Sequence, residues 1–251
     1  MQKIIYAVLL TQNSLELVNS FLMTIKGILN QDLYPITCNG IYAVVGKIKK
    51  DDLIADRSQI IEYANVIEKL AWEFTLLPMR YGSVMDSDDS IRNMLKRNKK
   101  EIVQNLKKVE NKNEFGLKIF YDFDKLKSEL SSEPEDVTEE KLKTATAKKN
   151  SVYKDYVNMK LKEHRDKELV LNFINKPISE IKEYLDKLNA IAKFKKMLDP
   201  TNIIDAVFLL DKSRKGELVE LVKNLQNKYT SLNFVLTGPW PPYNFVSISI
   251  K

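Results

Sequence analysis

The sequence predicts an α/β (α+β) protein with two domains, each containing strands that alternate with helices. Short runs of β-branched and aromatic residues, such as KIIYAVLL at 3–10, alternate with longer segments whose apolar residues recur every three to four positions. The chain of 251 residues is also long enough for two domains of ordinary size. Its 44% hydrophobic and 29% charged residues are typical of soluble globular proteins that bury a core.

The first half of the chain predicts four strands separated by three helices. The strands are expected at 3–10, 41–49, 76–84 and 115–123. The helices are expected from an Asn13/Glu16 capping pair to Leu29, from a cap at Asp56 to Phe74, and from Asp86 to Lys108. Pro35 and Gly40 are expected to bracket a turn. This order indicates an N-terminal α/β sandwich of ferredoxin-like type, with helices on one face of a mainly antiparallel sheet.

The second half predicts a ferredoxin-like domain with long helices. A Ser-, Pro- and acid-rich segment at 128–140 indicates the boundary, which divides the chain into domains 1–127 and 128–251. Helices are expected over 138–174, either as one projecting helix or with a break near 162–168, from Pro177 to an end at Asp199-Pro200, and over 214–228. Strands are expected at 203–210, 232–237 and 244–250. The strand at 115–123 is compatible with the sheet of this second domain.

Composition argues against the common enzyme classes. One cysteine, Cys38, and one histidine, His164, exclude a disulfide framework and a Cys/His zinc cluster. The seven glycines form neither a dinucleotide fingerprint nor a phosphate-binding loop. Asp86, Asp88 and Asp89 match the start of a helix better than a cation site. We therefore expect no catalytic residue, no metal and no cofactor.

Charge and hydropathy also limit the possible partners. The net charge is +6, but 40 basic residues are interleaved with 34 acidic ones, a pattern typical of solvated helix faces rather than of nucleic-acid binding. The chain lacks the aromatic strand motif of ferredoxin-like RNA-binding modules. Without an apolar run of roughly 20 residues, a membrane span is not expected. We expect a cytoplasmic protein that binds neither nucleic acid nor membrane.

Two segments have features that a fold alone does not require. In LLPMRYGSV (76–84), Arg80 and Tyr81 lie on a short kinked strand, and Arg80 can pair with a carboxylate either inside the protein or on a partner. In GPWPPYNF (238–245), three prolines restrict the backbone and hold Trp240, Tyr243 and Phe245 in set directions. These aromatic side chains either fill the core or bind a partner.

These segments, LPMRYGSV at 77–84 and GPWPPYNF at 238–245, resemble motifs of the gas vesicle protein F and L family (GvpF/GvpL). EFGLKI at 114–119 and AVFLL at 206–210 extend the resemblance over nearly the whole chain. One departure is YANVIEKL at 63–70, where the family often has His-Glu. The resemblance implies a gas vesicle accessory protein without a cofactor, whose partners are the hydrophobic shell protein and other accessory proteins.

Three functions follow from these observations. The first is assembly: the protein would bind the shell protein in the cytoplasm and support nucleation of the gas vesicle. The second is a minor structural component of the mature vesicle. The third, independent of the resemblance, is a ferredoxin-like RNA-binding module. Arg80, Tyr81, Trp240, Tyr243 and Phe245 are the candidate partner-binding residues.

Overall fold

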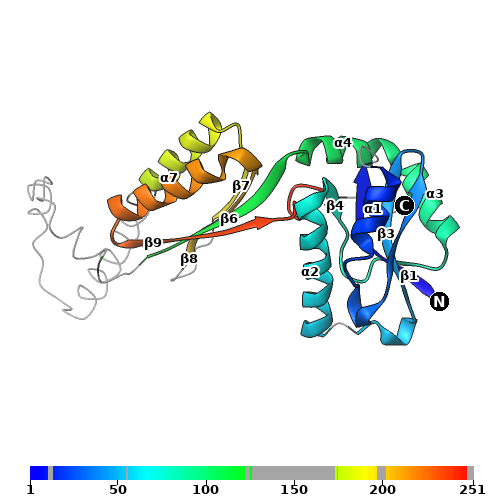
Figure 1. The fold of residues 1–251 in the computed structure, drawn as a ribbon. Helices are drawn as coiled ribbons and strands as arrows, with labels where there is room; N and C mark the ends of the chain where they lie inside the picture. The colour runs from blue at the N-terminus through cyan, green and yellow to red at the C-terminus, as the bar shows by residue number, and fades with distance from the viewer. Residues whose placement is uncertain are drawn as a thin grey trace, which may run out of the picture. The chain divides into compact units, whose positions relative to one another are not determined.

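A computed structural model describes residues 1–10, 14–54, 56–121, 125, 173, 175–196 and 202–247. It confirms the predicted class, because helices combine with antiparallel strands and two separate sheets are present (Figure 1). Two compact units contain Met1–Phe115, Val207–Ser213 and Thr237–Lys251 in the first, and Gly116–Ala206 and Arg214–Leu236 in the second. The boundary predicted at 128–140, the helix predicted at 138–174 and His164 lie outside the described residues.

The first sheet has five strands, ordered β2-β3-β1-β4, with β5 also paired to β1. The strands are β1 Gln2–Leu10, β2 Leu33–Cys38, β3 Ile41–Ile48, β4 Leu76–Pro78 and β5 Val84–Met85, and their pairings are antiparallel. The prediction that Pro35 belongs to a turn is wrong. It lies in β2, at the sheet edge, where a residue without an N–H is tolerated. The turn of this hairpin is Asn39-Gly40, whose φ angles of +49° and +85° suit these two residues.

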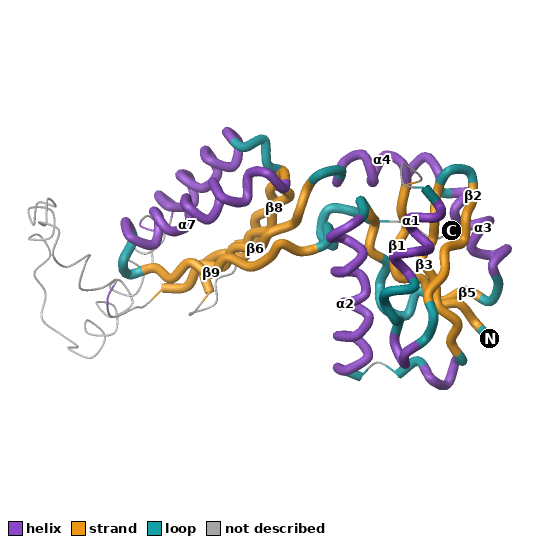
Figure 2. The backbone as a smooth tube through the Cα atoms, viewed as in Figure 1, coloured by secondary structure: helices purple, strands orange, loops and turns teal. Residues whose placement is uncertain are grey.

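Helices cover both faces of this sheet, and not one face as the sequence analysis predicted (Figure 2). The helical elements are α1 Leu15–Leu22, η1 Ile28–Asn30, η2 Lys50–Asp52, α2 Arg57–Glu73, α3 Asp88–Arg97 and α4 Lys99–Val109. Tyr6 and Leu9 pack with α1 and α2, whereas Ile5 and Val8 pack with α3 and α4. A bulge between Ile5 and Ala7 changes the alternation of β1. A strand buried on both faces explains why no charged residue follows Lys3 in KIIYAVLL.

Two helix predictions in this unit need correction. Ser14 caps helix α1, since its hydroxyl accepts the Leu17 N–H, and the helix ends at Leu22 instead of Leu29. The apolar residues beyond it are still buried, because Ile25 and Ile28 pack into the core from a loop and a 3₁₀ turn. The predicted helix 86–108 divides at Asn98, whose side-chain amide donates to the Met94 carbonyl and interrupts the helix. The cap at Asp56 is confirmed by its bond from the Gln59 N–H, 2.8 Å long.

The second sheet has the strand order β7-β8-β6-β9. Its strands are β6 Lys112–Tyr121, β7 Ile191–Lys196, β8 Asn202–Asp211 and β9 Leu232–Trp240; the helical segments are 175–187, η4 Lys212–Arg214 and α7 Lys215–Lys228. Because β8 separates β6 from β7, this order is compatible with a ferredoxin-like arrangement. The prediction of one helix from Pro177 to Asp199-Pro200 is wrong, because Asn189, with φ +52°, lies where the helix has ended and β7 follows at Ile191–Lys196. Residues 244–247, predicted as part of a strand, form a turn and a loop.

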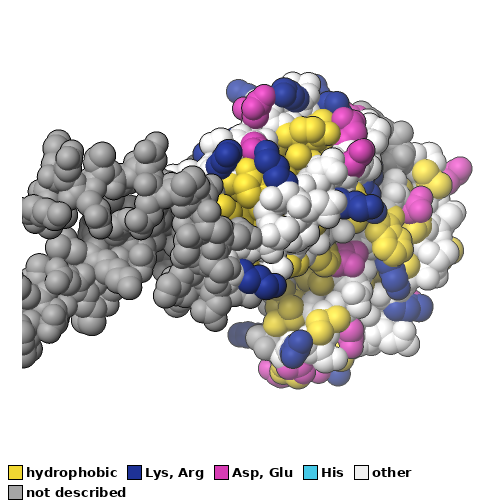
Figure 3. All heavy atoms as spheres, turned by 90° about the vertical axis from the view of Figure 1, so that its left-hand side faces the viewer, with side chains coloured by type: hydrophobic (Ala, Val, Ile, Leu, Met, Phe, Trp, Pro, Cys, Tyr) yellow, Lys and Arg dark blue, Asp and Glu magenta, His cyan; other side chains and the backbone are white. Residues whose placement is uncertain are grey.

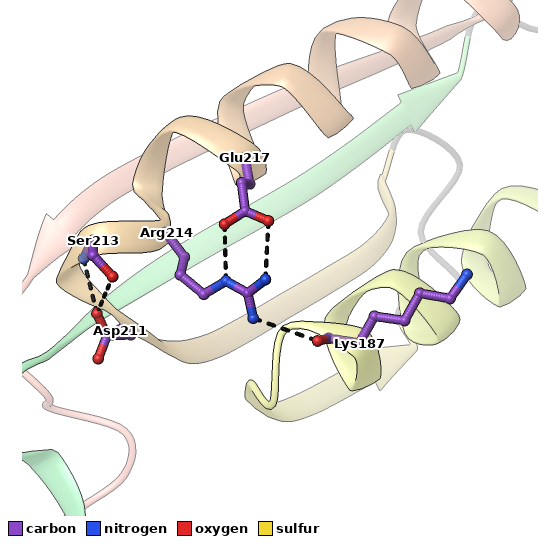
Figure 4. A network of polar contacts seen from close by, with 5 residues as sticks. All are labelled: Lys187, Asp211, Ser213, Arg214 and Glu217. Atoms are coloured by element: carbon purple, nitrogen blue, oxygen red, sulfur yellow. Dashed lines mark hydrogen bonds and ion pairs between the residues drawn. The ribbon is translucent and has the colours of Figure 1, made fainter.

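Polar contacts join helix 175–187 to α7 in the second unit. The Arg214 guanidinium donates to both carboxylate oxygens of Glu217, at 2.9 and 3.0 Å, and to the Lys187 carbonyl at 3.4 Å (Figure 4).

Helix α7 also bonds to the edge strand β9. The Gln226 side chain accepts the Phe234 N–H and donates to the Leu232 carbonyl. These two backbone groups belong to β9, at the edge of the sheet, so Gln226 bonds to the strand much as a neighbouring peptide would.

Candidate functional site

The LPMRYGSV segment is an interrupted edge of the first sheet. Leu77 and Met79 are buried, and Arg80 is exposed. Strands β4 and β5 both pair with β1, and the residues between them interrupt this pairing. At the start of the interruption, the Met79 N–H still donates to the Tyr6 carbonyl at 2.9 Å. Gly82 has φ +82° in the turn that brings the chain back. The result is a short projection that presents Arg80 outward.

Three tyrosines support this projection from inside. The rings of Tyr6 and Tyr63 stack at 4.7 Å, and Tyr81 meets Tyr63 edge to face at 5.4 Å. The Tyr63 hydroxyl lies 2.6 Å from the Ile5 carbonyl and 3.1 Å from the carbonyls of Met79 and Arg80. Burial raises the pKa of Tyr6 to about 12 and the pKa of Tyr63 well above its usual value. These two phenols therefore remain neutral at physiological pH.

Tyr81 and Arg80 differ in what their polar groups contact. The Tyr81 hydroxyl contacts the Ile54 carbonyl and lies 2.7 Å from Gln59 Oε1, so it is bound within the protein. For Arg80, none of the carboxylates in the described ranges lies within ion-pair distance of the guanidinium. The internal salt bridge considered for Arg80 is thus not found among the described residues, and Arg80 is exposed.

The GPWPPYNF segment is anchored to the start of β6. Asn244 donates to both carboxylate oxygens of the buried Glu114, through its N–H at 2.8 Å and its side-chain amide at 2.5 Å. Gly238 has φ +107°, and a Cβ at this position would lie 2.8 Å from the Glu114 carbonyl oxygen. The segment therefore needs glycine at this point, and EFGLKI supplies its anchor.

The three aromatic residues of this segment have different environments. Phe245 is buried in the core beneath α3 and α4, and Lys108 Nζ donates to its carbonyl at 2.9 Å. Trp240 and Tyr243 are each 41% exposed. Partial burial, with the negative charges of Glu68 and Glu114 nearby, raises the pKa of Tyr243 to about 12. Phe245 thus fills the core, while Trp240 and Tyr243 face the surface.

A groove of about 700 Å³ lies beside α2 and contains most of the predicted residues. Its described lining, which we call the α2 groove, is Ile60, Tyr63, Ala64, Ile67, Pro78, Met79, Arg80, Tyr81, Ser83, Tyr243, Val246 and Ser247. Arg80, Tyr81 and Tyr243, from segments far apart in the sequence, therefore meet in one place. The predicted residues Trp240 and Phe245 are not part of it.

Trp240 lines a second hollow of about 190 Å³ farther along α2. The described residues around it are Glu68, Ala71, Trp72, Asn113, Lys212, Pro239, Trp240 and Pro241. Trp72 is 72% exposed, although burial of an indole is strongly favourable. The α2 residues of the groove and the hollow continue at intervals of three and four positions, so they form one stripe on the helix. We call this stripe with the two cavities the α2 face.

The contribution of α2 to this face was not predicted from the sequence. Ile60 and Ile61 are both about half-exposed, whereas the residues that face the core are Tyr63, Val66, Ile67, Leu70 and Phe74. A signal was available, because apolar residues cover a wider arc of α2 than one core-facing stripe needs. Trp72 lies in that additional arc.

Other groups in the described residues carry structural roles. Ser87 caps α3, and Asp88 and Asp89 lie in its first turn, where Asp88 is 3.5 Å from Lys3 and Asp89 is 2.8 Å from Arg92. Within the ranges that the structure describes, no group of three His, Cys, Asp or Glu side chains could hold a metal ion.

Basic and acidic side chains are interspersed with hydrophobic ones on the face in Figure 3. Of the helices in the described part of the chain, none has both the length and the apolar character that crossing a bilayer requires.

Known proteins resemble the chain in sequence and in fold. The family model described as "Gas vesicle synthesis protein GvpL/GvpF" matches residues 2–247. Gas vesicle protein L of Streptomyces sp. (strain CB03234) is 22% identical over 79% of the chain and 71% of its own length, and gas vesicle protein F1 of Halobacterium salinarum is 22% identical over 88% and 84%. Crystal structures of GvpF from Anabaena sp. PCC7120 and Microcystis aeruginosa superpose with TM-scores of 0.70 and 0.71 at 20% identity, over 97% or more of each chain.

Proposed function

Because the chain belongs to the gas vesicle synthesis protein GvpL/GvpF family, we propose that it is an assembly protein and not an enzyme. In this proposal it binds the hydrophobic shell protein in the cytoplasm and supports nucleation of the vesicle. Other gas vesicle accessory proteins are its further partners. The α2 face is the surface that takes part in this binding.

The observation that carries this proposal is the exposure of large apolar side chains along one helix and one adjoining segment. Trp72, Trp240 and Tyr243 join the half-exposed Ile60 on the α2 face. Contiguous apolar surface of this kind is typical of protein-binding sites, and tryptophan and tyrosine often contribute most of the binding free energy. Such a site would cover the apolar surface of the shell protein, and the shell protein would otherwise aggregate.

The first experiment tests the assembly role in a vesicle-forming host. Deletion of the gene should abolish or deform the vesicles, and the unaltered gene should restore them. A gene with Trp72→Ala and Trp240→Ala together should fail to restore normal vesicles. Met23→Ala is the matched control, because Met23 is an exposed apolar residue outside the α2 face. Normal vesicles in the deletion strain would refute the proposed function.

A second experiment tests shell-protein binding directly. Tagged protein co-expressed with the shell protein should capture it, and Trp240→Ala should reduce the captured amount while leaving the first unit folded. Washed vesicles should contain little of the protein if it acts during assembly. A constant amount retained per vesicle would instead support the minor structural component.

A further inference from the structure

We propose that the α2 groove binds an amphipathic helix of the shell protein, and that this helix carries a carboxylate which pairs with Arg80. This inference rests on the proposed function and names the structural element that would be bound. Of the described residues that line it, Arg80 is the one with a charged side chain.

Arg80 is the group of the described lining that decides which charge a bound segment should carry. The hydroxyls of Tyr63 and Tyr81 are already bonded within the protein. Much of the remaining lining is aliphatic, including Ile60, Ala64 and Ile67 on α2. A segment that fills this groove must therefore be apolar over most of its contact and acidic at one point, since a guanidinium at an apolar surface favours a bidentate carboxylate partner.

Backbone chemistry favours a helix over an extended strand as the occupant. A strand would need free N–H and C=O groups along the edge formed by residues 78–80. Pro78 has no N–H, the Met79 N–H is bonded to Tyr6, and the carbonyls of Met79 and Arg80 face the Tyr63 hydroxyl. A helix satisfies its own backbone groups and needs only side-chain contacts.

The length of the groove sets the size of the bound segment. Its α2 side extends from Ile60 to Ile67, which is about 10 Å at 1.5 Å per residue. A helix lying along this side would present about two turns, with apolar anchors at positions i, i+3 or i+4, and i+7. The acidic residue would lie next to this stripe, on the side that faces the projection bearing Arg80.

The test compares groove variants in the co-expression pull-down with the shell protein. Arg80→Glu reverses the charge at an exposed position and should lower the captured amount about tenfold, because an ion pair becomes a repulsion. Arg80→Lys keeps the charge but loses the fork geometry and should have a smaller effect, about threefold. Ala64→Trp places an indole in the groove and should reduce capture without changing any charge. Arg97→Glu is the matched control, because Arg97 is exposed on α3, away from the groove.

Each outcome decides between the two proposals. Capture by the wild type and by Arg97→Glu, but not by Arg80→Glu or Ala64→Trp, would support the groove. A shell protein with one acidic residue changed to lysine should then regain binding to Arg80→Glu, which identifies the paired carboxylate. Equal capture by wild type, Arg80→Glu and Ala64→Trp would overturn the groove inference while the proposed function stands. No capture by the wild type would overturn both.

Discussion

Replacing Asn244 by aspartate should detach the GPWPPYNF segment from β6, because it puts a second negative charge against Glu114. Asn244→Asp keeps the shape of the side chain but changes the amide that donates to Glu114 Oε1 into a carboxylate. The lost bond is charge-assisted and contributes about 1.5–3 kcal/mol. Two unit charges 4 Å apart repel by about 4 kcal/mol at an effective dielectric constant of 20, part of which relaxes as the side chains separate.

We therefore expect Asn244→Asp to lower the free energy of unfolding of the first unit by about 4 kcal/mol at pH 8. Asn244→Ala keeps the backbone donor and loses the side-chain bond to Glu114, so it should cost about 2 kcal/mol. The difference between the variants should shrink at pH 5, because one carboxyl can then take up a proton and donate to the other.

Tryptophan fluorescence during urea unfolding is a suitable assay. The chain has two tryptophans, so Trp72→Phe leaves Trp240, within the segment, as the reporter. Asn233→Ala, an exposed asparagine on β9, is the control and should change stability little. If Asn244→Asp and Asn244→Ala were equally stable at pH 8, or kept the same difference at pH 5, the proposed role of Glu114 as the anchor would be refuted.

Three further predictions follow from the structure. Gly238→Ala should destabilise the first unit by about 2 kcal/mol or more in the same assay, because φ is +107° and the backbone of β6 leaves no room for a Cβ; Gly216→Ala, in open space, is the control. Because the pKa of Tyr63 is raised in the folded protein, its contribution to stability should be complete below pH 10 and should decline as the pH rises further, since the unfolded chain ionises first. Tyr63→Phe should reduce this loss of stability at alkaline pH in urea titrations. An unchanged dependence on pH would refute the role of Tyr63. Gln226→Leu should expose the edge of β9 and cause concentration-dependent self-association, measured by light scattering, whereas Glu220→Leu should remain monodisperse.

Local signals in the sequence predicted most elements correctly, because the responsible interactions lie within a few residues. Asp56 caps α2 through a bond three residues away, and β8 and α7 follow their apolar periodicity. The errors arose where two readings were possible locally. The Asn39-Gly40 dipeptide is a strong hairpin signal. Strand β2 was not predicted because a proline usually argues against a strand, and Pro35 is tolerated only because β2 lies at the edge of the sheet.

The candidate site shows the same division. The sequence by itself identified Arg80, Tyr81, Trp240, Tyr243 and Phe245 as candidates. Three prolines that restrict the backbone, and an arginine on a short predicted strand, can be recognised without the fold. It left open which of the aromatic residues are structural. Only the tertiary structure decided that Phe245 fills the core and that Tyr243 shares a groove with Arg80, since both outcomes depend on the contact between Asn244 and Glu114, 130 residues apart. The exposure of Trp72 likewise depends on which side of α2 packs against the sheet, because a helix that is apolar over a wide arc can bury more than one stripe.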